Sequence, residues 1–345
     1  MTQRVAINGF GRIGRTAFRA WAARPDIQQR VQLVAINERA DRDTAIHLTR
    51  FDSTHGRFPH AITATHRGMH TCGTDIALLS EEHIAALPWE AEGIDLVLEC
   101  TGSFSDRAQA EQHLQTGANR VLFSQPAEPT VDITVVWGIN HADIERRHRV
   151  LSAGSCTTNA LCPVLKVFND ALGIEAGTVT TVHSAMNDQP VLDAYHNTDL
   201  RKTRAAFQSI IPVDTGLAIG VPRILPSLEG KLTAHALRVP TLNVSAMDVT
   251  VYTDKPCTAA QVNSLLAEAA QGGLAGVLGF TTEPLASCDF NGETCSSVVD
   301  ASQTQVSGQR LVKVLIWFDN EWAYANRLLD IAVRLDELGP ADTHI

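Results

Sequence analysis

Short apolar runs alternate with helical stretches over the first 150 residues of the chain. These runs are apolar on both faces, which is typical of strands buried in a parallel sheet. They lie at residues 5–8, 32–37, 95–99, 120–123, 133–137 and 149–152. Strands and helices that alternate in this way predict a doubly wound α/β domain with a parallel sheet.

The pattern changes after about residue 155. Longer runs with period-two alternation lie at residues 178–183, 231–239, 241–253 and 313–318. Such runs are typical of antiparallel strands with one face covered, so we expect a second, α+β domain with a mostly antiparallel sheet. Residues 187–204 are polar and weakly periodic and predict a long functional loop. Residues 321–337 carry an apolar stripe and predict a C-terminal helix.

Composition narrows the class of protein. The chain has 345 residues and a net charge of −10, so a nucleic-acid surface is not expected. No apolar run approaches the ~20 residues that span a bilayer, and the N-terminus runs straight into a strand without a signal peptide. Seven scattered cysteines without a C-x-x-C pair argue against disulfides and against a metal site. We therefore expect a cytoplasmic protein with reduced thiols and no membrane partner.

A glycine motif follows the first strand and opens a helix. Gly9 permits a tight turn, Gly11 lets the backbone approach a pyrophosphate, and Gly14 packs the helix on the strand. Glu38, at the end of the second strand, is placed to accept hydrogen bonds from ribose hydroxyls, which favours NAD over NADP. The neighbouring Arg39 leaves NADP use open. The motif predicts a Rossmann-type dinucleotide site, and a glycine turn without a nucleotide is the alternative.

Thr101 follows the strand that ends at Glu99, at a strand end where such sheets place ligands. It is a candidate cofactor contact, and a plain turn is almost as well supported.

Cys156 is the candidate nucleophile. It follows Ser155, a suitable N-cap, and precedes a helical pattern, so helix amides should point at the thiol and lower its pKa. Pro163 lies inside that pattern and predicts a kink. His183, at the end of a strand, is the candidate base and ion-pair partner. The alternatives are a buried small hydrophobe and a core histidine, and spacing alone does not select His183 among 13 histidines.

Anion-binding candidates come later in the chain. Arg238 lies in an otherwise apolar run and needs a partner, which is either a phosphate or a buried carboxylate. Arg201 belongs to a basic segment that is by default a solvated face or an interface loop. Thr215 and Gly216 offer a hydroxyl and an amide to the same anion. Asn320, at the end of the last strand, is suited to hold a carboxamide such as that of nicotinamide, and a helix N-cap is the alternative.

These segments together resemble the glyceraldehyde-3-phosphate dehydrogenase superfamily over nearly the whole chain. The most specific matches are residues 7–15, 155–159, 238–241 and 319–321. The resemblance implies that Cys156 is the nucleophile and His183 its base, with NAD as the cofactor. It further implies cofactor contacts at Arg12, Ile13 and Asn320, substrate contacts at Ser155, Thr157, Arg201, Thr215, Gly216 and Arg238, and a homotetramer in which the 187–204 loop reaches a neighbouring subunit's cofactor.

Within the superfamily the chain is most similar to the erythrose-4-phosphate branch. Met186 stands where phosphorylating members have a phosphate-binding threonine, and Asp214 stands where they have serine or threonine. The resemblance implies oxidation of erythrose 4-phosphate to 4-phosphoerythronate, with water as the acyl acceptor, in a route to pyridoxal phosphate. An inserted residue near His196–Thr198 and Gly154 in place of alanine depart from the branch.

We therefore expect an NAD-binding domain at 1–155, a catalytic domain at 156–320, and a C-terminal helix at 321–345 that packs back on the first domain. A phosphorylating glyceraldehyde-3-phosphate dehydrogenase is the nearest alternative. A semialdehyde dehydrogenase would also use a cysteine nucleophile and a histidine base, but the sequence motifs of that class are not found. A non-catalytic NAD-binding redox sensor would keep the glycines and Cys156 but has no need of His183 and Arg238.

Overall fold

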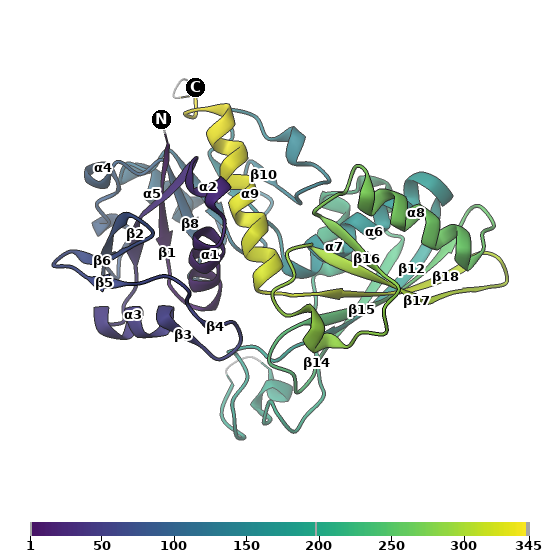
Figure 1. Cartoon of the computed structure of the whole chain (residues 1–345). Coiled ribbons are helices and arrows are strands. Elements are labelled where there is room, and N and C mark those ends of the chain that lie inside the picture. The colour runs from purple at the N-terminus through teal and green to yellow at the C-terminus, as the bar shows by residue number, and fades with distance from the viewer. Residues whose placement is uncertain (1, 197–198, 343–345) are drawn as a thin grey trace. The chain divides into compact units, whose positions relative to one another are not determined.

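The computed structural model describes residues 2–196 and 199–342 (Figure 1). The chain divides into two compact units, the first formed by Met1–Ser155 with Ala325–Ile345 and the second by Cys156–Tyr324. Within the described part of the chain, no helix has both the length and the apolarity that crossing a bilayer requires. The inserted residue near His196–Thr198 falls on positions 197 and 198, outside the described residues.

The first unit is built on a nine-stranded sheet, sheet A, with the order β10-β11-β9-β8-β1-β2-β7-β6-β5. Every neighbouring pair from β10 to β7 is parallel, and β6 and β5 add an antiparallel edge. The bounds are β1 Gln3–Asn8, β2 Val31–Asn37, β5 Thr63–Ala64, β6 Gly68–Thr71, β7 Thr74–Leu79, β8 Leu96–Glu99, β9 Arg120–Phe123, β10 Ile133–Thr134 and β11 Val150–Ser152. The doubly wound parallel sheet predicted from the apolar runs is confirmed.

The strand order reverses at β1. The chain moves from β1 to β2 on one side and later returns to β8 on the other, so the carboxyl ends of β1 and β8 form the switch point at which such sheets bind ligands. The predicted strand at 133–137 is shorter, since β10 ends at Thr134. The edge strands β5, β6 and β7 and the small hairpin of β3 Phe51–Asp52 and β4 Gly56–Arg57 were not predicted, because they are short or partly exposed and lack a clear apolar run.

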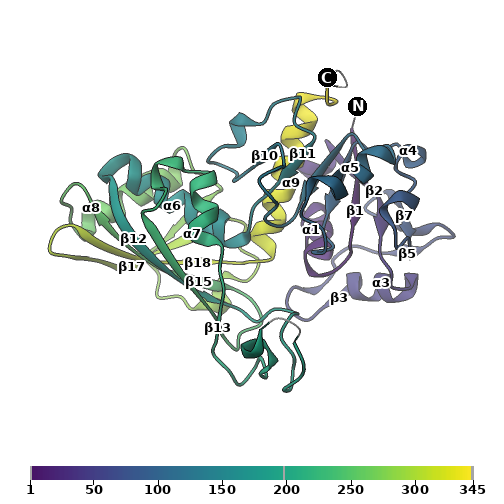
Figure 2. The same ribbon diagram turned by 180° about the vertical axis from the view of Figure 1, so that it is seen from behind.

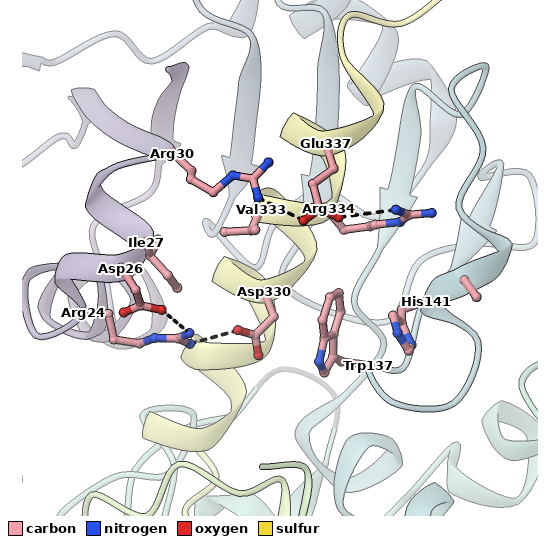
Figure 3. Close-up of a pocket in the computed structure, with 11 residues that line it drawn as sticks. Arg24, Asp26, Ile27, Arg30, Trp137, His141, Asp330, Val333, Arg334 and Glu337 are labelled. Atoms are coloured by element: carbon pink, nitrogen blue, oxygen red, sulfur yellow. Dashed lines mark hydrogen bonds and ion pairs between the residues drawn. The ribbon is translucent and has the colours of Figure 1, made fainter. Parts of the chain in front are cut away.

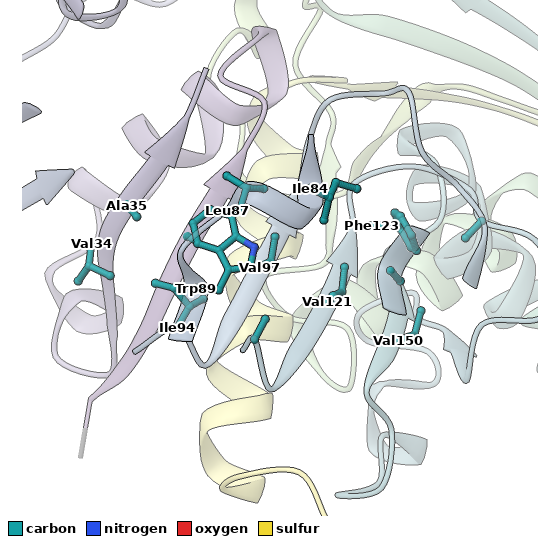
Figure 4. Packing of buried hydrophobic residues seen from close by; sticks show 14 of the residues in the cluster. Val34, Ala35, Ile84, Leu87, Trp89, Ile94, Val97, Val121, Phe123 and Val150 are labelled. Carbon is teal, nitrogen blue, oxygen red and sulfur yellow. The ribbon is translucent and has the colours of Figure 1, made fainter. Parts of the chain in front are cut away.

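Helices pack on sheet A and bury its apolar side chains. Their bounds are α1 Arg12–Ala22, α2 Pro25–Gln28, α3 Arg42–Arg50, α4 Trp89–Glu92, α5 Arg107–Gln115 and the C-terminal α9 Trp322–Leu338. The side chains of Asp41 and Asp106 accept hydrogen bonds at the N-termini of α3 and α5, as N-caps do. Trp89, Val97, Val121 and Phe123 lie at the centre of one core cluster and are fully buried (Figure 4).

The second unit is built on a seven-stranded sheet, sheet C, with the order β13-β14-β12-β15-β18-β17-β16. Most pairs are antiparallel, as predicted, while β12 with β14 and β16 with β17 are parallel. The bounds are β12 Ile174–His183, β13 Ile211–Val213, β14 Leu232–Arg238, β15 Ser245–Thr253, β16 Leu278–Thr281, β17 Ser297–Ser307 and β18 Leu311–Phe318. The helices α6 Cys156–Leu172, α7 Leu217–Gly220 and α8 Ala259–Gln271 lie on one face of this sheet (Figures 1 and 2).

Two local expectations differ from the structure. The strand predicted from residue 241 begins at Ser245, because Val244 adopts a positive φ of 64° that ends extended pairing. Pro163 lies inside α6, as expected, and the kink predicted there stays a prediction. Inside the expected loop at 187–204 a short 3₁₀ turn spans Leu200–Thr203, with the Asp199 side chain accepting at its start.

Candidate active site

Four polar side chains lie along one edge of sheet C, the edge formed by the ends of its neighbouring strands. β12 and β14 are parallel, and their last residues, His183 and Arg238, lie opposite each other in the register. β15 is antiparallel to β12 and begins at Ser245, which pairs with the last residue of β18, Phe318. Asn320 follows two residues later. Strand direction therefore brings His183, Arg238, Ser245 and Asn320 to the same edge, although up to 137 residues separate them in the sequence.

Cys156 and His183 meet at this edge. The Sγ of Cys156, the first residue of α6, lies 3.7 Å from Nε2 of His183. The ring of His183 is buried and packs edge-on against Phe318, with ring centroids 6.2 Å apart. Its Nδ1 lies 2.8 Å from the carbonyl oxygen of Ser184. The nucleophile and base expected from the sequence are therefore within proton-transfer reach, and a carbonyl orients the base.

The charge state of this pair differs from the sequence expectation. Burial raises the pKa of Cys156 to about 11, although the charge of Arg238 and the amides of Thr157 and Cys156 itself act to lower it. Burial, followed by the charge of Arg238, lowers the pKa of His183 to about 4. The helix amides do point at the thiol, but desolvation outweighs them. At neutral pH the pair is a thiol beside a neutral imidazole, and the expected thiolate–imidazolium pair is wrong for this state of the chain.

Arg238 reaches the same histidine from β14. Its Nη1 lies 2.9 Å from Nδ1 of His183 and 3.4 Å from the Ser184 carbonyl oxygen. Within the described residues no carboxylate forms an ion pair with Arg238, and its buried Nε has no hydrogen-bond partner. The charge of Asp188 acts on Arg238, but Asp188 is itself paired with Lys202 at 2.8 Å. Of the two partners considered for Arg238, a contacting carboxylate is not found among the described residues, and a phosphate stays a prediction.

Asn320 is held by two serines that the sequence analysis missed. Its Oδ1 accepts hydrogen bonds from the hydroxyls of Ser184, at 3.0 Å, and Ser245, at 2.9 Å. This arrangement leaves the Asn320 Nδ2 group as a donor. The helix cap is supplied instead by Asp319, whose carboxylate accepts from the amides of Glu321 and Trp322. Serine hydroxyls are too common in sequences for this pairing to be read without the sheet register.

The other substrate-binding candidates lie at three places in the second unit and next to it along the chain. Thr215 and Gly216 follow β13, and the Thr215 hydroxyl accepts from the amide of Leu217 at 3.2 Å. Arg201 lies in the exposed turn at 200–203, which packs near β13. Ser155 and Thr157 flank Cys156 and are half-buried. Contacts of these five residues with a substrate remain predictions.

The glycine loop of sheet A has the form that a pyrophosphate requires. Gly9 has a φ of 90°, and a Cβ placed on it would lie 2.6 Å from the backbone nitrogen of Thr101. A Cβ on Gly14 would lie 2.2 Å from the carbonyl oxygen of Gly9, so helix α1 packs too closely for a side chain. Gly11 starts α1, and a Cβ there meets nothing within 4 Å. Two glycines close the turn and the third leaves the helix N-terminus open to an anion.

The cofactor-side residues are held by contacts within the first unit. Glu38 accepts hydrogen bonds from the amides of Phe10, at 2.8 Å, and Arg39, at 2.8 Å, which fixes its carboxylate beside the glycine loop. Arg12, the first residue of α1, forms an ion pair with the buried carboxylate of Asp52. Burial alone would raise the pKa of Asp52, but hydrogen bonds from His55 and Arg12 hold it well below its usual range. Ile13 is half-buried on the first turn of α1.

A buried polar network supports this edge of sheet A. Glu99, at the end of β8, accepts from Asn8 Nδ2 at 2.6 Å, from the Thr101 amide at 2.9 Å and from the Thr101 hydroxyl. His113 Nε2 lies 3.1 Å from the same carboxylate, and its Nδ1 accepts from Trp89 Nε1. Asn8 in turn accepts from Asn37 Nδ2 at 2.8 Å. Sequence reasoning missed this network because its hydrogen-bonded partners lie up to 91 residues apart.

A cavity of about 300 Å³ opens at the switch point of sheet A. Its lining includes Gly9, Gly11, Glu38 and Thr101. Four of the residues expected to contact a dinucleotide therefore line one hollow, with a helix N-terminus for the pyrophosphate and a carboxylate for ribose hydroxyls. Its lining does not include Arg12, Ile13 or Gly14. These features fit NAD.

A second hollow, of about 530 Å³, lies beside α9, which contributes Asp330, Val333, Arg334 and Glu337 to its lining (Figure 3). Its charged side chains pair with one another, as Arg24 does with Asp330 at 2.9 Å and Arg30 with Glu337 at 3.0 Å. Trp137 and His141 stack at its rim with ring centroids 4.3 Å apart. No cysteine, serine or threonine is among the residues that line this hollow.

A dinucleotide-binding sheet in one unit and a cysteine–histidine–arginine cluster in the other are features of an NAD-dependent dehydrogenase. Residues 3–107 match the family model for the NAD binding domain of glyceraldehyde 3-phosphate dehydrogenase, and residues 155–320 match the model for its C-terminal domain. The chain belongs to the glyceraldehyde-3-phosphate dehydrogenase superfamily, and its first domain binds NAD.

Proposed function

We propose that this enzyme oxidises a short phosphorylated aldehyde, D-erythrose 4-phosphate, to 4-phosphoerythronate. The observation that carries the proposal is the position of Arg238, a half-buried arginine that has no contacting carboxylate among the described residues and lies beside the Cys156–His183 pair. A cation of this kind favours an anionic substrate, and a phosphate monoester is a suitable ligand for it.

The chemistry begins with transfer of the Cys156 proton to Nε2 of His183 as Sγ attacks the aldehyde carbon. The Cys156 amide at the start of α6 is placed to stabilise the resulting oxyanion. His183 returns this proton to the oxyanion, which gives the hydroxyl of the hemithioacetal, and takes it again as the hydride leaves the same carbon. NAD, when bound, would supply the hydride acceptor. Asn320, oriented by its two serines, offers Nδ2 to hold the nicotinamide carboxamide.

Water is the proposed acceptor of the acyl group. Met186 is 45% exposed and offers no hydroxyl donor to an inorganic phosphate. Asp214 lies exposed directly before Thr215, next to the proposed phosphate contact. Two unit charges ~4 Å apart repel by about 4 kcal/mol at an effective dielectric constant near 20, and less where solvent is close. Both residues therefore oppose phosphate as the acyl acceptor and favour hydrolysis of the thioester.

The test measures NADH formation with erythrose 4-phosphate and with glyceraldehyde 3-phosphate, each with and without inorganic phosphate. We expect turnover of erythrose 4-phosphate that does not require phosphate. If omission of phosphate stops turnover and glyceraldehyde 3-phosphate is the better substrate, the enzyme is the phosphorylating glycolytic type. A chain that binds NAD but oxidises neither aldehyde would be the non-catalytic redox sensor.

The enzyme is also proposed to act in the cytoplasm as a homotetramer. Large apolar side chains are exposed along the segment from 191 to 219, namely Val191, Leu192, Tyr195, Leu200, Phe207, Ile210 and Ile219. An exposed apolar segment of this kind favours contact with a second copy of the chain. A monomeric mass in solution, measured by light scattering, would contradict the tetramer without affecting the proposed chemistry.

A further inference from the structure

Two neighbours contact Nδ1 of His183, and they require opposite protonation states of this nitrogen. The Ser184 carbonyl oxygen, at 2.8 Å, only accepts hydrogen bonds, so it requires a proton on Nδ1. The Arg238 guanidinium, at 2.9 Å, only donates, so it requires a lone pair on Nδ1. A neutral imidazole satisfies one of them at a time. The ring therefore has two tautomers, each stabilised by a different neighbour.

The choice of tautomer decides what faces the nucleophile. With the proton on Nδ1, the lone pair of Nε2 faces Sγ of Cys156 across 3.7 Å and accepts the thiol proton. With Arg238 donating to Nδ1, the proton sits on Nε2 and the ring has no lone pair to offer the thiol. The first tautomer is a base toward Cys156, and the second is not.

We propose that Arg238 is a positioning residue that sets the tautomer of His183, and that a phosphate monoester bound by Arg238 switches His183 into the base form. The anion takes the guanidinium donor away from Nδ1, and Nδ1 then donates to Ser184. The proton lost at Nε2 and gained at Nδ1 exchanges with water, so the ring stays neutral throughout. The proposal rests on the proposed function, because it assigns the substrate phosphate a second task besides binding.

The contacts show which of the two neighbours is able to move. Ser184 is fixed at three points, since its amide donates to Ser245 at 3.1 Å, its hydroxyl donates to Asn320 at 3.0 Å, and its carbonyl faces the ring. Arg238 is held only by His183 and the Ser184 carbonyl among the described residues, with its Nε unpartnered. An anion that binds Arg238 therefore moves the guanidinium donor, while the acceptor, the Ser184 carbonyl oxygen, stays in place.

The direct test observes the tautomer by ¹⁵N NMR of the full-length protein labelled at histidine, with the His183→Asn variant identifying the signals. Glycerol 3-phosphate, a phosphate monoester without an aldehyde, is the probe. We expect the protonated-type and unprotonated-type nitrogen signals of His183 to exchange places as the probe saturates. An unchanged tautomer at saturation, or the Nδ1-protonated form already dominant without the probe, overturns the proposal.

A kinetic test separates switching from simple binding. Unphosphorylated D-erythrose is the substrate, and glycerol 3-phosphate is supplied separately. We expect the added probe to raise kcat several-fold in the native enzyme. The Arg238→Met variant lacks the donor, so its kcat with D-erythrose alone should exceed that of the native enzyme, and the probe should leave it unchanged. If Arg238 only binds substrate, Arg238→Met shows no gain with D-erythrose, and the switch is wrong.

Two controls keep the outcomes distinct. Lys313→Gln removes a cation from sheet C that pairs with Asp248 far from His183, and it should respond to the probe as the native enzyme does. If neither aldehyde is oxidised by any variant, the proposed function fails, while the NMR measurement still decides the tautomer switch. An Arg238→Met protein that does not fold leaves the native-enzyme arms of both tests intact.

Discussion

The two functional edges of the molecule treat charge in opposite ways. At the glycine edge of sheet A, the carboxylates of Glu38 and Glu99 are held by hydrogen bonds from backbone amides and side chains. At the thiol edge of sheet C, the half-buried Arg238 has no contacting carboxylate among the described residues, and the shifted pKa values of Cys156 and His183 favour a neutral thiol and a neutral imidazole beside it. The charges of the first edge are therefore held by the protein itself, whereas the charge of Arg238 is not paired with a carboxylate.

This difference fits two kinds of ligand. A cofactor that is bound and released intact needs a rigid cradle, and satisfied hydrogen bonds supply rigidity. A thiol that must attack only the right aldehyde benefits from staying protonated until the substrate's own charge is in place. Variants and measurements at either edge test this difference.

The largest effect is expected from removing the nucleophile. Cys156→Ser should abolish NADH formation, by ~10⁴-fold or more, because the nucleophilic step disappears. NAD affinity, measured by calorimetry, should stay near the native value, since the glycine edge is untouched. The matched control is Cys162→Ala on the same helix, which removes a buried thiol and should keep turnover. Full activity of Cys156→Ser would show that Cys156 is not the nucleophile.

The pH dependence of thiol alkylation tests the neutral pair. With the pKa of Cys156 raised to about 11, the thiolate fraction is small at pH 7 and grows about tenfold per pH unit up to pH 10. The alkylation rate of the NAD-free enzyme by iodoacetamide should follow that slope. His183, with its pKa lowered to about 4, is neutral throughout this range. A rate plateau between about pH 5 and 8 would instead show a thiolate–imidazolium pair and would remove the contrast between the edges.

Substitutions of Gly11 and Gly14 separate the effect of the glycine loop on NAD affinity from its effect on stability. Gly11→Ala adds a Cβ that meets nothing within 4 Å, so the melting temperature should barely change, while the methyl group stands where a pyrophosphate approaches and NAD affinity should fall about tenfold or more. Gly14→Ala pushes a Cβ to 2.2 Å from the Gly9 carbonyl and should destabilise the fold by ~1–3 kcal/mol. Native NAD affinity in Gly11→Ala would place the pyrophosphate elsewhere.

The smallest effect is expected from the network behind the cradle. Glu99→Gln replaces one acceptor oxygen with a donor that faces donors on Asn8, Thr101 or His113, which should cost ~1–3 kcal/mol of stability and weaken NAD binding modestly. The exposed Glu111→Gln on α5 is the matched control. Chemical unfolding of both variants measures the difference, and equal stability would show that the Glu99 contacts are not energetically significant.

Local signals were enough to predict the glycine loop, because the turn at Gly9 and the close packing at Gly14 demand residues without a Cβ. Six strands of sheet A were predicted because they are apolar on both faces, whereas β5, β6 and β7 were not. A strand end made His183 a candidate and an apolar run made Arg238 one, but their contact depends on the parallel pairing of β12 with β14, which lies beyond any local pattern.

Long-range and solvent effects account for what was missed. The Asn8–Glu99–His113 network and the serines behind Asn320 join positions that are far apart in sequence and individually unremarkable. The direction of the Cys156 pKa shift depends on burial, a tertiary property that the helix position alone does not reveal. Contacts of Arg201, Thr215 and Gly216 with substrate phosphates remain predictions.

The central claim is that Cys156 carries the acyl group of an anionic aldehyde. The most direct measurement is rapid quenching of the native enzyme with NAD and erythrose 4-phosphate, followed by mass spectrometry of its cysteine peptides. The account predicts a phosphoerythronyl adduct on the peptide of Cys156, formed with one equivalent of NADH and lost to water when no phosphate is present. NADH formed without any adduct on that peptide, or with the adduct on another cysteine, would contradict it.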